Sequence, residues 1–190
     1  NMSTQAQKAE ALRSFHQGPK ILALPNAWDV ASAKVVEAAG FLTIATTSAG
    51  TANMLGYVDS QRISRGEMLD IVCRIAQAVK VPVTADMEAG YATTAEGMYD
   101  TAMELIEAGA VGLNLEDSEE GESKLVDLNL QWEKIRTVRE AGAKAGIKLV
   151  LNARTDAYWW KGSLPETPLA ETVHRAPAFR EAGADCIFDP

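Results

Sequence analysis

The stretch Val-Thr-Ala-Asp-Met-Glu-Ala-Gly-Tyr, residues 83–91, is an apolar run that ends in acidic residues. Two later runs end in the same way, as Gly-Leu-Asn-Leu-Glu-Asp-Ser (112–118) and Val-Leu-Asn-Ala-Arg-Thr-Asp-Ala-Tyr (150–158). Alternate residues of a strand share one face, so the alternate polar residues should lie together and the intervening apolar residues should face a helix layer. The polar positions are Thr84, Asp86, Glu88, Asn114, Glu116, Asn152, Arg154 and Asp156. The pattern predicts three strands that contribute to one site.

A short sequence phrase recurs along the chain outside these runs. It reads Val-Glu-Ala-Ala-Gly-Phe at 36–41, Ile-Glu-Ala-Gly-Ala-Val at 106–111 and Arg-Glu-Ala-Gly-Ala-Asp at 180–185. A glycine just past a helix, followed at once by an apolar strand, is typical of βα units and a parallel sheet.

Six such units are predicted along the chain. The expected strands are 21–24, 41–46, 82–86, 111–115, 148–152 and 185–188. The expected helices are 4–16, 30–39, 64–79, 94–108, 131–145 and 168–182. A Ser/Gly/Ala/Thr segment follows the second strand at 47–53, and loops are expected at 118–123 and 157–167.

The fold class that fits is α/β, either a (β/α)₈ TIM-type barrel or an open doubly wound sheet. Polar residues at five strand ends favour the barrel, because closure brings all these ends together. These residues are Asn26, Thr47, Asp86, Glu116 and Arg154. A whole barrel needs about 250 residues. With 190 residues and about six units, we expect a single barrel domain over 1–190 that is truncated after strand six.

Composition excludes several classes of partner. The net charge of −8 and the pI near 4.8 argue against nucleic acid and anionic membranes, which both attract basic proteins. The two cysteines, Cys73 and Cys186, lack the spacing of metal ligands and suit a reducing compartment. No transmembrane run or signal-like apolar core is seen, so a cytoplasmic protein is expected.

Six short motifs together resemble the isocitrate lyase/phosphoenolpyruvate mutase superfamily, in its 2-methylisocitrate lyase-like and carboxyphosphonoenolpyruvate phosphonomutase-like branch. The resemblance runs from about Leu24 to Phe188. Its motifs are Leu-Pro-Asn-Ala-Trp-Asp-Val-Ala-Ser-Ala (24–33), Thr-Thr-Ser-Ala-Gly (46–50), Leu-Gly-Tyr-Val-Asp-Ser (55–60), Ala-Asp-Met-Glu-Ala-Gly-Tyr (85–91), Asn-Leu-Glu-Asp-Ser (114–118) and Asn-Ala-Arg-Thr-Asp (152–156).

The resemblance implies a Mg²⁺-dependent barrel that acts on small 2-oxo acids and assembles as a homo-oligomer, a dimer of dimers if a C-terminal helix is present. The metal ligands it implies are Asp59, Asp86, Glu88 and Glu116. We expect substrate to be bound by Thr47, Ser48, Ala49, Asp86, Asn114, Asn152 and Arg154. The expected catalytic residues are Asp59, Glu116 and Arg154.

Elementary electrostatics supports a metal, because several carboxylates at one site repel each other unless some protonate or a divalent cation neutralises them. All-oxygen ligands suit Mg²⁺, with Mn²⁺ as the alternative. The rival interpretation is a set of separate surface salt bridges. Arg154 either holds a substrate carboxylate or forms an ion pair with Asp156 or Glu116, and Asn114 and Asn152 either orient ligands or satisfy buried backbone groups.

One departure from the superfamily bears on the reaction. Isocitrate and methylisocitrate lyases carry a Lys-Lys/Arg-Cys-Gly-His motif after strand four, whose cysteine serves as the acid. Residues 118–124 read Ser-Glu-Glu-Gly-Glu-Ser-Lys and contain neither Cys nor His. We therefore expect a carbon–carbon lyase or decarboxylase for an oxaloacetate-like acid. The alternatives are a phosphonate P–C mutase or hydrolase, and a homologue that binds 2-oxo acids without catalysis.

Overall fold

The computed structural model describes residues 3–59, 63–118, 124–159 and 167–190. Their helices are α1 (Gln5–Gln17), α2 (Val30–Ala38), α3 (Ser48–Leu55), α4 (Arg65–Ala78), α5 (Ala95–Glu107), α6 (Leu128–Ala145) and α7 (Pro168–Ala182). Their strands are β1 (Asn26–Ala27), β2 (Ile44–Thr46), β3 (Val83–Asp86), β4 (Gly112–Glu116), β5 (Val150–Arg154) and β6 (Cys186–Phe188).

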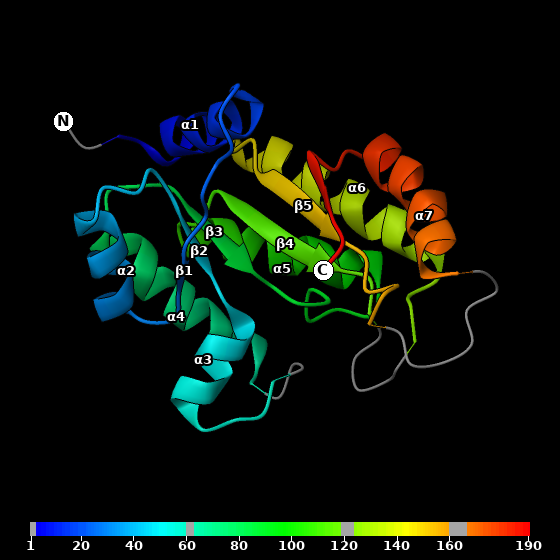
Figure 1. The fold of residues 1–190 in the computed structure, drawn as a ribbon, viewed down its shortest axis with the longest axis horizontal. Coiled ribbons are helices and arrows are strands. Elements are labelled where there is room, and N and C mark those ends of the chain that lie inside the picture. Colours follow the sequence, from blue (N-terminus) through cyan, green and yellow to red (C-terminus); the bar gives the residue numbers. More distant parts are fainter. Residues whose placement is uncertain (1–2, 60–62, 119–123, 160–166) are drawn as a thin grey trace.

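The strands form one parallel sheet in the order β1-β2-β3-β4-β5-β6 (Figure 1). A doubly wound sheet reverses its strand order at a switch point, whereas the wall of a (β/α) barrel keeps its strands in chain order. The observed order is that of a barrel wall. The carboxyl ends of the strands therefore lie along one edge, as the sequence predicted.

Local sequence signals account for the helix ends. Asp29 caps α2 by accepting a hydrogen bond from Ser32 N at 2.7 Å, and Thr94 caps α5 in the same way. The glycine of the recurring phrase adopts a left-handed conformation after the helix, with φ +94° at Gly109 and +115° at Gly183. Side chains with a Cβ disfavour this conformation, so the phrase ends each helix and starts the next strand.

The outer face of the sheet packs against the helix layer. The apolar residues between the polar positions of β3, β4 and β5 are at most 1% exposed and belong to one core cluster. They are Ala85, Met87, Leu113, Leu115, Leu149, Leu151 and Ala153. This arrangement confirms the predicted division of the strands into an apolar and a polar face.

Helix α1 lies across the end of the sheet where the strands begin (Figure 1). Leu12 of α1 is completely buried there, and a Cβ added to Gly112 at the start of β4 would lie 2.9 Å from Leu12 Cδ2. His16 Nδ1 of α1 lies 3.5 Å from Cys186 Sγ in β6. Helix α1 thus contacts the sheet at the end opposite to the polar edge.

One prediction near the start of the chain was wrong, and one helix was missed. Residues 21–24 form no strand, and Ile21 is 99% exposed; β1 is instead the pair Asn26–Ala27, which finds its partners in β2. An apolar run becomes a strand only where a neighbour supplies hydrogen bonds. The segment 47–53, which we did not assign to a helix, contains most of α3, because Thr47 caps the helix and its alanines favour it.

The other predicted elements agree with the structure within a few residues, and 168–182 matches α7. Strand β5 lies two residues later than predicted at both ends. Most of the expected loops at 118–123 and 157–167 lie outside the described residues. Across the described ranges, none of the helices has both the length and the apolar character that a membrane span requires.

Candidate active site

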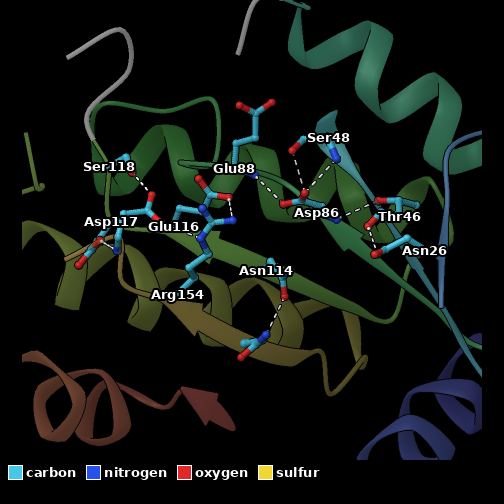
Figure 2. Close-up of polar contacts among 12 residues, drawn as sticks. Asn26, Thr46, Ser48, Asp86, Glu88, Asn114, Glu116, Asp117, Ser118 and Arg154 are labelled. Atoms are coloured by element: carbon cyan, nitrogen blue, oxygen red, sulfur yellow. Dashed lines mark hydrogen bonds and ion pairs between the residues drawn. The ribbon is translucent and has the colours of Figure 1, made fainter. Parts of the chain in front are cut away.

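The strand register sorts the polar residues at the carboxyl edge into two layers. Asp86 pairs with Asn114, and Asn114 pairs with Asn152, which places these three in one layer. Glu116 pairs with Arg154 in the next layer, nearer the strand ends. Register partners in parallel strands point to the same face, so side chains from β3, β4 and β5 meet in one place (Figure 2).

Asp86 is joined to the start of α3. Its Oδ2 accepts hydrogen bonds from Ser48 N at 2.9 Å and from Ser48 Oγ at 2.8 Å. Its own N–H donates to Thr46 Oγ1 at 2.9 Å. The other carboxylate oxygen, Oδ1, receives one long contact, from Glu88 N at 3.5 Å. Asp86 is thus fixed through one oxygen and keeps the second for a ligand.

The rest of the predicted substrate-binding segment forms the first turn of α3. Thr47 Oγ1 accepts from Gly50 N at 3.3 Å, so Thr47 acts as the helix cap. Among the described residues, Ala49 N–H has no hydrogen-bond partner. A helix N-terminus presents such N–H groups with a favourable dipole for anions.

Asn114 and Asn152 contact each other directly. Asn152 Nδ2 donates to Asn114 Oδ1 at 2.8 Å (Figure 2). The structure thus brings together the two amides that the sequence placed on one face. The assignment of their oxygen and nitrogen atoms gives Asn114 an acceptor role and leaves Asn152 Oδ1 for other donors.

Arg154 forms ion pairs with both Glu116 and Asp156, the contacts that we considered as an alternative to substrate binding. Its Nη1 lies 2.8 Å from Glu116 Oε1, and its Nε lies 2.6 Å from Asp156 Oδ1. Among the described residues, Nη2 has no partner. Arg154 is therefore both a member of a structural cluster and a donor with one amino group left for an anion.

Glu116 is buried in this cluster. Burial raises the pKa of its carboxyl to about 8; Arg154 opposes this shift, and Asp86, Asp156 and Glu88 add to it. Burial and the neighbouring acids together thus outweigh the opposing effect of Arg154 on this pKa.

Two aromatic rings enclose the Arg154 guanidinium, a feature that sequence reasoning missed. Its Cζ lies 4.4 Å from the centroid of the Trp159 ring and 5.6 Å from that of Phe188. Stacking on aromatic faces is favourable for arginine. The contact with Phe188 follows from the strand register, because Phe188 of β6 is the register partner of Arg154 of β5.

Glu88 does not share the face of Asp86, contrary to the prediction from simple alternation. Strand β3 ends at Asp86, and Glu88 adopts a left-handed conformation with φ +49°, as does Tyr91 with φ +53°. The side chain of Glu88 therefore does not continue the Asp86 face, and in Figure 2 its carboxylate points away from Asp86 and Glu116. Tyr91 Oη donates to Glu88 Oε1 at 3.1 Å, and burial together with the Glu88 charge raises the Tyr91 pKa.

Asp59 lies in the exposed segment after α3. Its charge contributes to the raised pKa of Tyr91, together with those of Glu88 and Asp86, so it lies within electrostatic range of the same edge. Within residues 3–59, 63–118, 124–159 and 167–190, no three Asp, Glu, His or Cys side chains lie close enough to hold a metal ion by themselves. The acids gather at one edge without forming a closed cage.

A second buried polar network lies behind this edge and was not predicted. Asp117 is completely buried and contacts Arg175 of α7, while Lys134 of α6 is 2% exposed and donates from Nζ to Ala89 O at 2.6 Å. Burial raises the pKa of Asp117 to about 6 and lowers that of Lys134 to about 8. Asp117 belongs to the quoted run 112–118 but falls between its alternate polar positions, whereas Lys134 and Arg175 lie in ordinary helix sequence, so the pattern did not predict their contacts.

Comparisons with known proteins agree with this geometry. The family model described as phosphoenolpyruvate phosphomutase matches residues 12–190. A putative phosphonomutase from Burkholderia cenocepacia J2315 has 39% sequence identity and a TM-score of 0.90, with 96% of this chain and 74% of that chain covered.

Two further relatives have named activities. An oxaloacetate decarboxylase from Rhodopseudomonas palustris is 29% identical over 192 residues, covering 97% of this chain and 64% of the relative. A phosphonopyruvate hydrolase solved with oxalate and Mg²⁺ has 26% identity and a TM-score of 0.87, covering 96% of this chain and 62% of that chain. The chain spans 60% to 64% of the length of the curated relatives it matches.

Proposed function

Because the chain belongs to the phosphoenolpyruvate phosphomutase family, we propose that it is a Mg²⁺-dependent lyase or decarboxylase of a small 2-oxo acid such as oxaloacetate. The observation that carries the proposal is the placement of Arg154 beside Glu116, next to the Asp86 layer, at the carboxyl edge of the sheet. This edge combines a cation for a carboxylate with an excess of oxygen ligands. In barrels of this kind the active site lies at that edge.

The donor set fits a magnesium ion. Asp86 has one oxygen available. Glu116 is a second carboxyl at this edge, and burial, with a smaller contribution from Asp86, Asp156 and Glu88, raises its pKa against the effect of Arg154. Mg²⁺ commonly takes one or two protein carboxylates and fills its other positions with water and substrate oxygens, so a cage of three acids is not required. We propose Asp86 as the direct ligand, with Glu116, Glu88 and Asp59 acting directly or through water.

When bound, the metal would supply Lewis-acid polarisation of the substrate's 2-oxo group. The Arg154 Nη2 group would donate to the substrate carboxylate and fix its orientation. The Ala49 N–H at the start of α3 would donate to the oxygen on which negative charge develops. Ser48 holds Asp86 in place through two hydrogen bonds and would keep that carboxylate from turning away.

For oxaloacetate, the bond between C3 and C4 breaks and its electron pair passes into the enolate of pyruvate. CO₂ leaves, and solvent supplies the proton that C3 takes up. This route needs no cysteine acid, in keeping with the absence of Cys and His from residues 118–124.

Phosphonate chemistry is the second candidate, since a putative phosphonomutase and a phosphonopyruvate hydrolase are among the structural relatives. A phosphonopyruvate molecule offers the same carboxylate and 2-oxo group to the same residues. The two candidates differ in the bond that breaks, carbon–carbon or phosphorus–carbon.

The test is a side-by-side assay of the full-length protein with oxaloacetate and with phosphonopyruvate, each with Mg²⁺ and a no-protein control. We expect pyruvate and CO₂ from oxaloacetate, and Asp86→Ala should abolish both turnover and Mg²⁺ binding. Asp100→Asn, which changes an exposed carboxylate on α5, should leave both unchanged. Formation of phosphate or of phosphoenolpyruvate from phosphonopyruvate, with no turnover of oxaloacetate, would favour the second candidate. A fully active Asp86→Ala variant would refute the assigned metal ligand. Oxalate binding without turnover of either acid would favour a non-catalytic binder.

A further inference from the structure

We propose that Arg175 of α7 is a positioning residue for Arg154, acting through Asp117 and Asp156. The inference deepens the proposed function and rests on it in one respect, the role of Arg154 in binding a substrate carboxylate. Arg175 itself lies behind the polar edge and has no direct contact with Arg154 among the described residues.

The first link joins α7 to the end of β4. Arg175 Nη1 lies 3.2 Å from Asp117 Oδ2 and donates to Val126 O at 2.9 Å. Val126 N in turn donates to Asp117 O at 2.7 Å. Both side chains are buried, 8% exposed for Arg175 and 0% for Asp117. Arg175 thus fixes the Asp117 carboxylate directly and its main chain through Val126.

The second link joins Asp117 to the end of β5. Asp117 N donates to Arg154 O at 3.1 Å, and Asp117 Oδ1 accepts from Asp156 N at 2.9 Å. One residue therefore holds the backbone of 154–156 at both ends. Without its carboxylate in this orientation, the position of Asp156 would no longer be set.

The third link reaches the guanidinium. Asp156 Oδ1 accepts from Arg154 Nε at 2.6 Å, and Asp156 Oδ2 accepts from Ser118 Oγ. The two oxygens of Asp156 are thus both engaged, and Arg154 Nε is held while Nη2 stays available. A rotation of Asp156 would turn the planar fork of Arg154 and redirect Nη2.

The cost of this arrangement supports a functional reason for it. A fully buried carboxylate loses its hydration, and a buried ion pair often contributes no more stability than well-packed apolar residues. Arg175 also makes a third contact, from its Nε to Glu171 Oε1 at 2.7 Å, which fixes the arginine side chain on its own helix. An arrangement that fixes Arg175 through both Nε and Nη1 suits the alignment of a ligand-binding group.

The test compares Arg175→Met and Arg175→Lys with the wild-type full-length protein. Arg65→Met is the matched control, because it removes a 2.8 Å inter-helix ion pair with Glu104 that has no link to Arg154. The first readout is the ¹⁵Nε–¹Hε NMR signal of Arg154, assigned by its loss in Arg154→Lys. We expect this signal to shift and broaden in Arg175→Met, to change less in Arg175→Lys, and to stay unchanged in Arg65→Met.

The second readout is binding and turnover. We expect the Kd for oxalate, measured with Mg²⁺, to rise about tenfold in Arg175→Met, with a larger effect on KM than on kcat, because ground-state alignment of a carboxylate is lost. If Arg175→Met does not fold, Arg175→Lys and Asp117→Asn carry the same comparison.

An unchanged Arg154 Nε signal together with an unchanged oxalate Kd in a folded variant would overturn the proposal. Failure of the proposed function is a separate result, since wild-type protein without turnover of any 2-oxo acid would still report the Arg154 Nε signal. Loss of kcat with an unchanged Nε signal would point to general destabilisation and would also overturn the positioning role.

Discussion

The side chain of Arg154 shows what sequence reasoning can and cannot find at the scale of a residue. Its place at the end of β5, on the same face as Glu116, follows from alternation and was predicted. Its enclosure by Trp159 and Phe188 depends on β6 lying beside β5 and on the path of the chain after the strand. Alternation within one strand carries no information about either contact.

Glu88 shows the opposite case, in which a local rule was extended too far. The period of two holds up to Asp86 and fails at the next polar residue, because the backbone turns into the left-handed region. The neighbouring Gly90 also has a positive φ, of +88°, so the whole segment is a tight turn. Gly90 indicates that a turn follows the strand, but the sequence does not show at which residue the alternation stops.

Lys134 yields a prediction about pH. Burial lowers the pKa of its ammonium group to about 8 from 10.5, with the Asp117 charge opposing the shift. The unfolded chain therefore binds more protons than the native protein between these values, so the free energy of unfolding should rise with pH in that window. The gain has an upper limit of roughly 3.5 kcal/mol, since the pKa is lowered by about 2.5 units and each unit corresponds to about 1.4 kcal/mol.

Urea denaturation of wild type and Lys134→Met at pH 7.5 and pH 9.5 checks this prediction. The stability of wild type relative to the variant should be greater at the higher pH. An equal difference at both pH values would mean that the lysine is not held in a low-dielectric site.

At the scale of elements, the glycines of the recurring phrase were dependable signals of helix ends, and short apolar runs were not dependable signals of strands. Helices begin at Asp29, Ser64 and Thr94 as their side chains dictate, since each accepts a backbone hydrogen bond in the first turn. Strand β1 was misjudged because a neighbouring strand decides it, whereas α3 has local signals, the Thr47 cap and its alanines, that the prediction did not use. A two-residue strand exists only through its pairing with β2, which no local window contains.

The contact of α1 with β4 gives a prediction at this scale. A Cβ at Gly112 would lie 2.8 Å from Val150 O, 2.9 Å from Leu12 Cδ2 and 2.9 Å from Thr84 Oγ1. Backbone as well as side chain would have to move, so Gly112→Ala should destabilise the protein by about 1–3 kcal/mol, as overpacking does.

The control is Gly66→Ala in α4, where an added Cβ meets nothing within 4 Å. Alanine is the better helix former, so this change should be neutral or stabilising by up to about 1 kcal/mol. Both values follow from urea denaturation curves. Equal stabilities for the two variants would contradict the close packing of α1 against the sheet.

At the scale of the molecule, the order of the strands was predictable and the assembly is not yet tested. The barrel was preferred to the doubly wound sheet because polar groups end five strands, and the observed order of β1 to β6 agrees with that choice. The single domain over 1–190, its truncation and the homo-oligomer stay predictions. The buried Asp117–Arg175 network could not be foreseen, since it needs the contact between α7 and the end of β4.

The proposed metal gives a prediction for the molecule as a whole. The core of the sheet consists of apolar side chains from the strands and helices, and the candidate ligands lie at its edge. Chelation of divalent cations with EDTA should therefore abolish turnover of oxaloacetate while the circular dichroism spectrum and the cooperative unfolding transition persist.

Readdition of Mg²⁺ should restore the rate, after subtraction of the loss of oxaloacetate in a protein-free sample with the same Mg²⁺. Unfolding upon chelation would instead assign the metal a structural role. Full activity in EDTA would exclude the proposed cofactor.

The contact between His16 and Cys186 has a practical consequence for observing the protein in motion. The thiol is half-buried where α1 meets β6, and burial raises its pKa, so it should react slowly with alkylating reagents. Cys73 on α4 provides an internal reference for the same reagent. The ratio of the two labelling rates should therefore report how often α1 separates transiently from the sheet. This thiol provides a chemical probe of local opening at the end of the sheet opposite to the candidate active site.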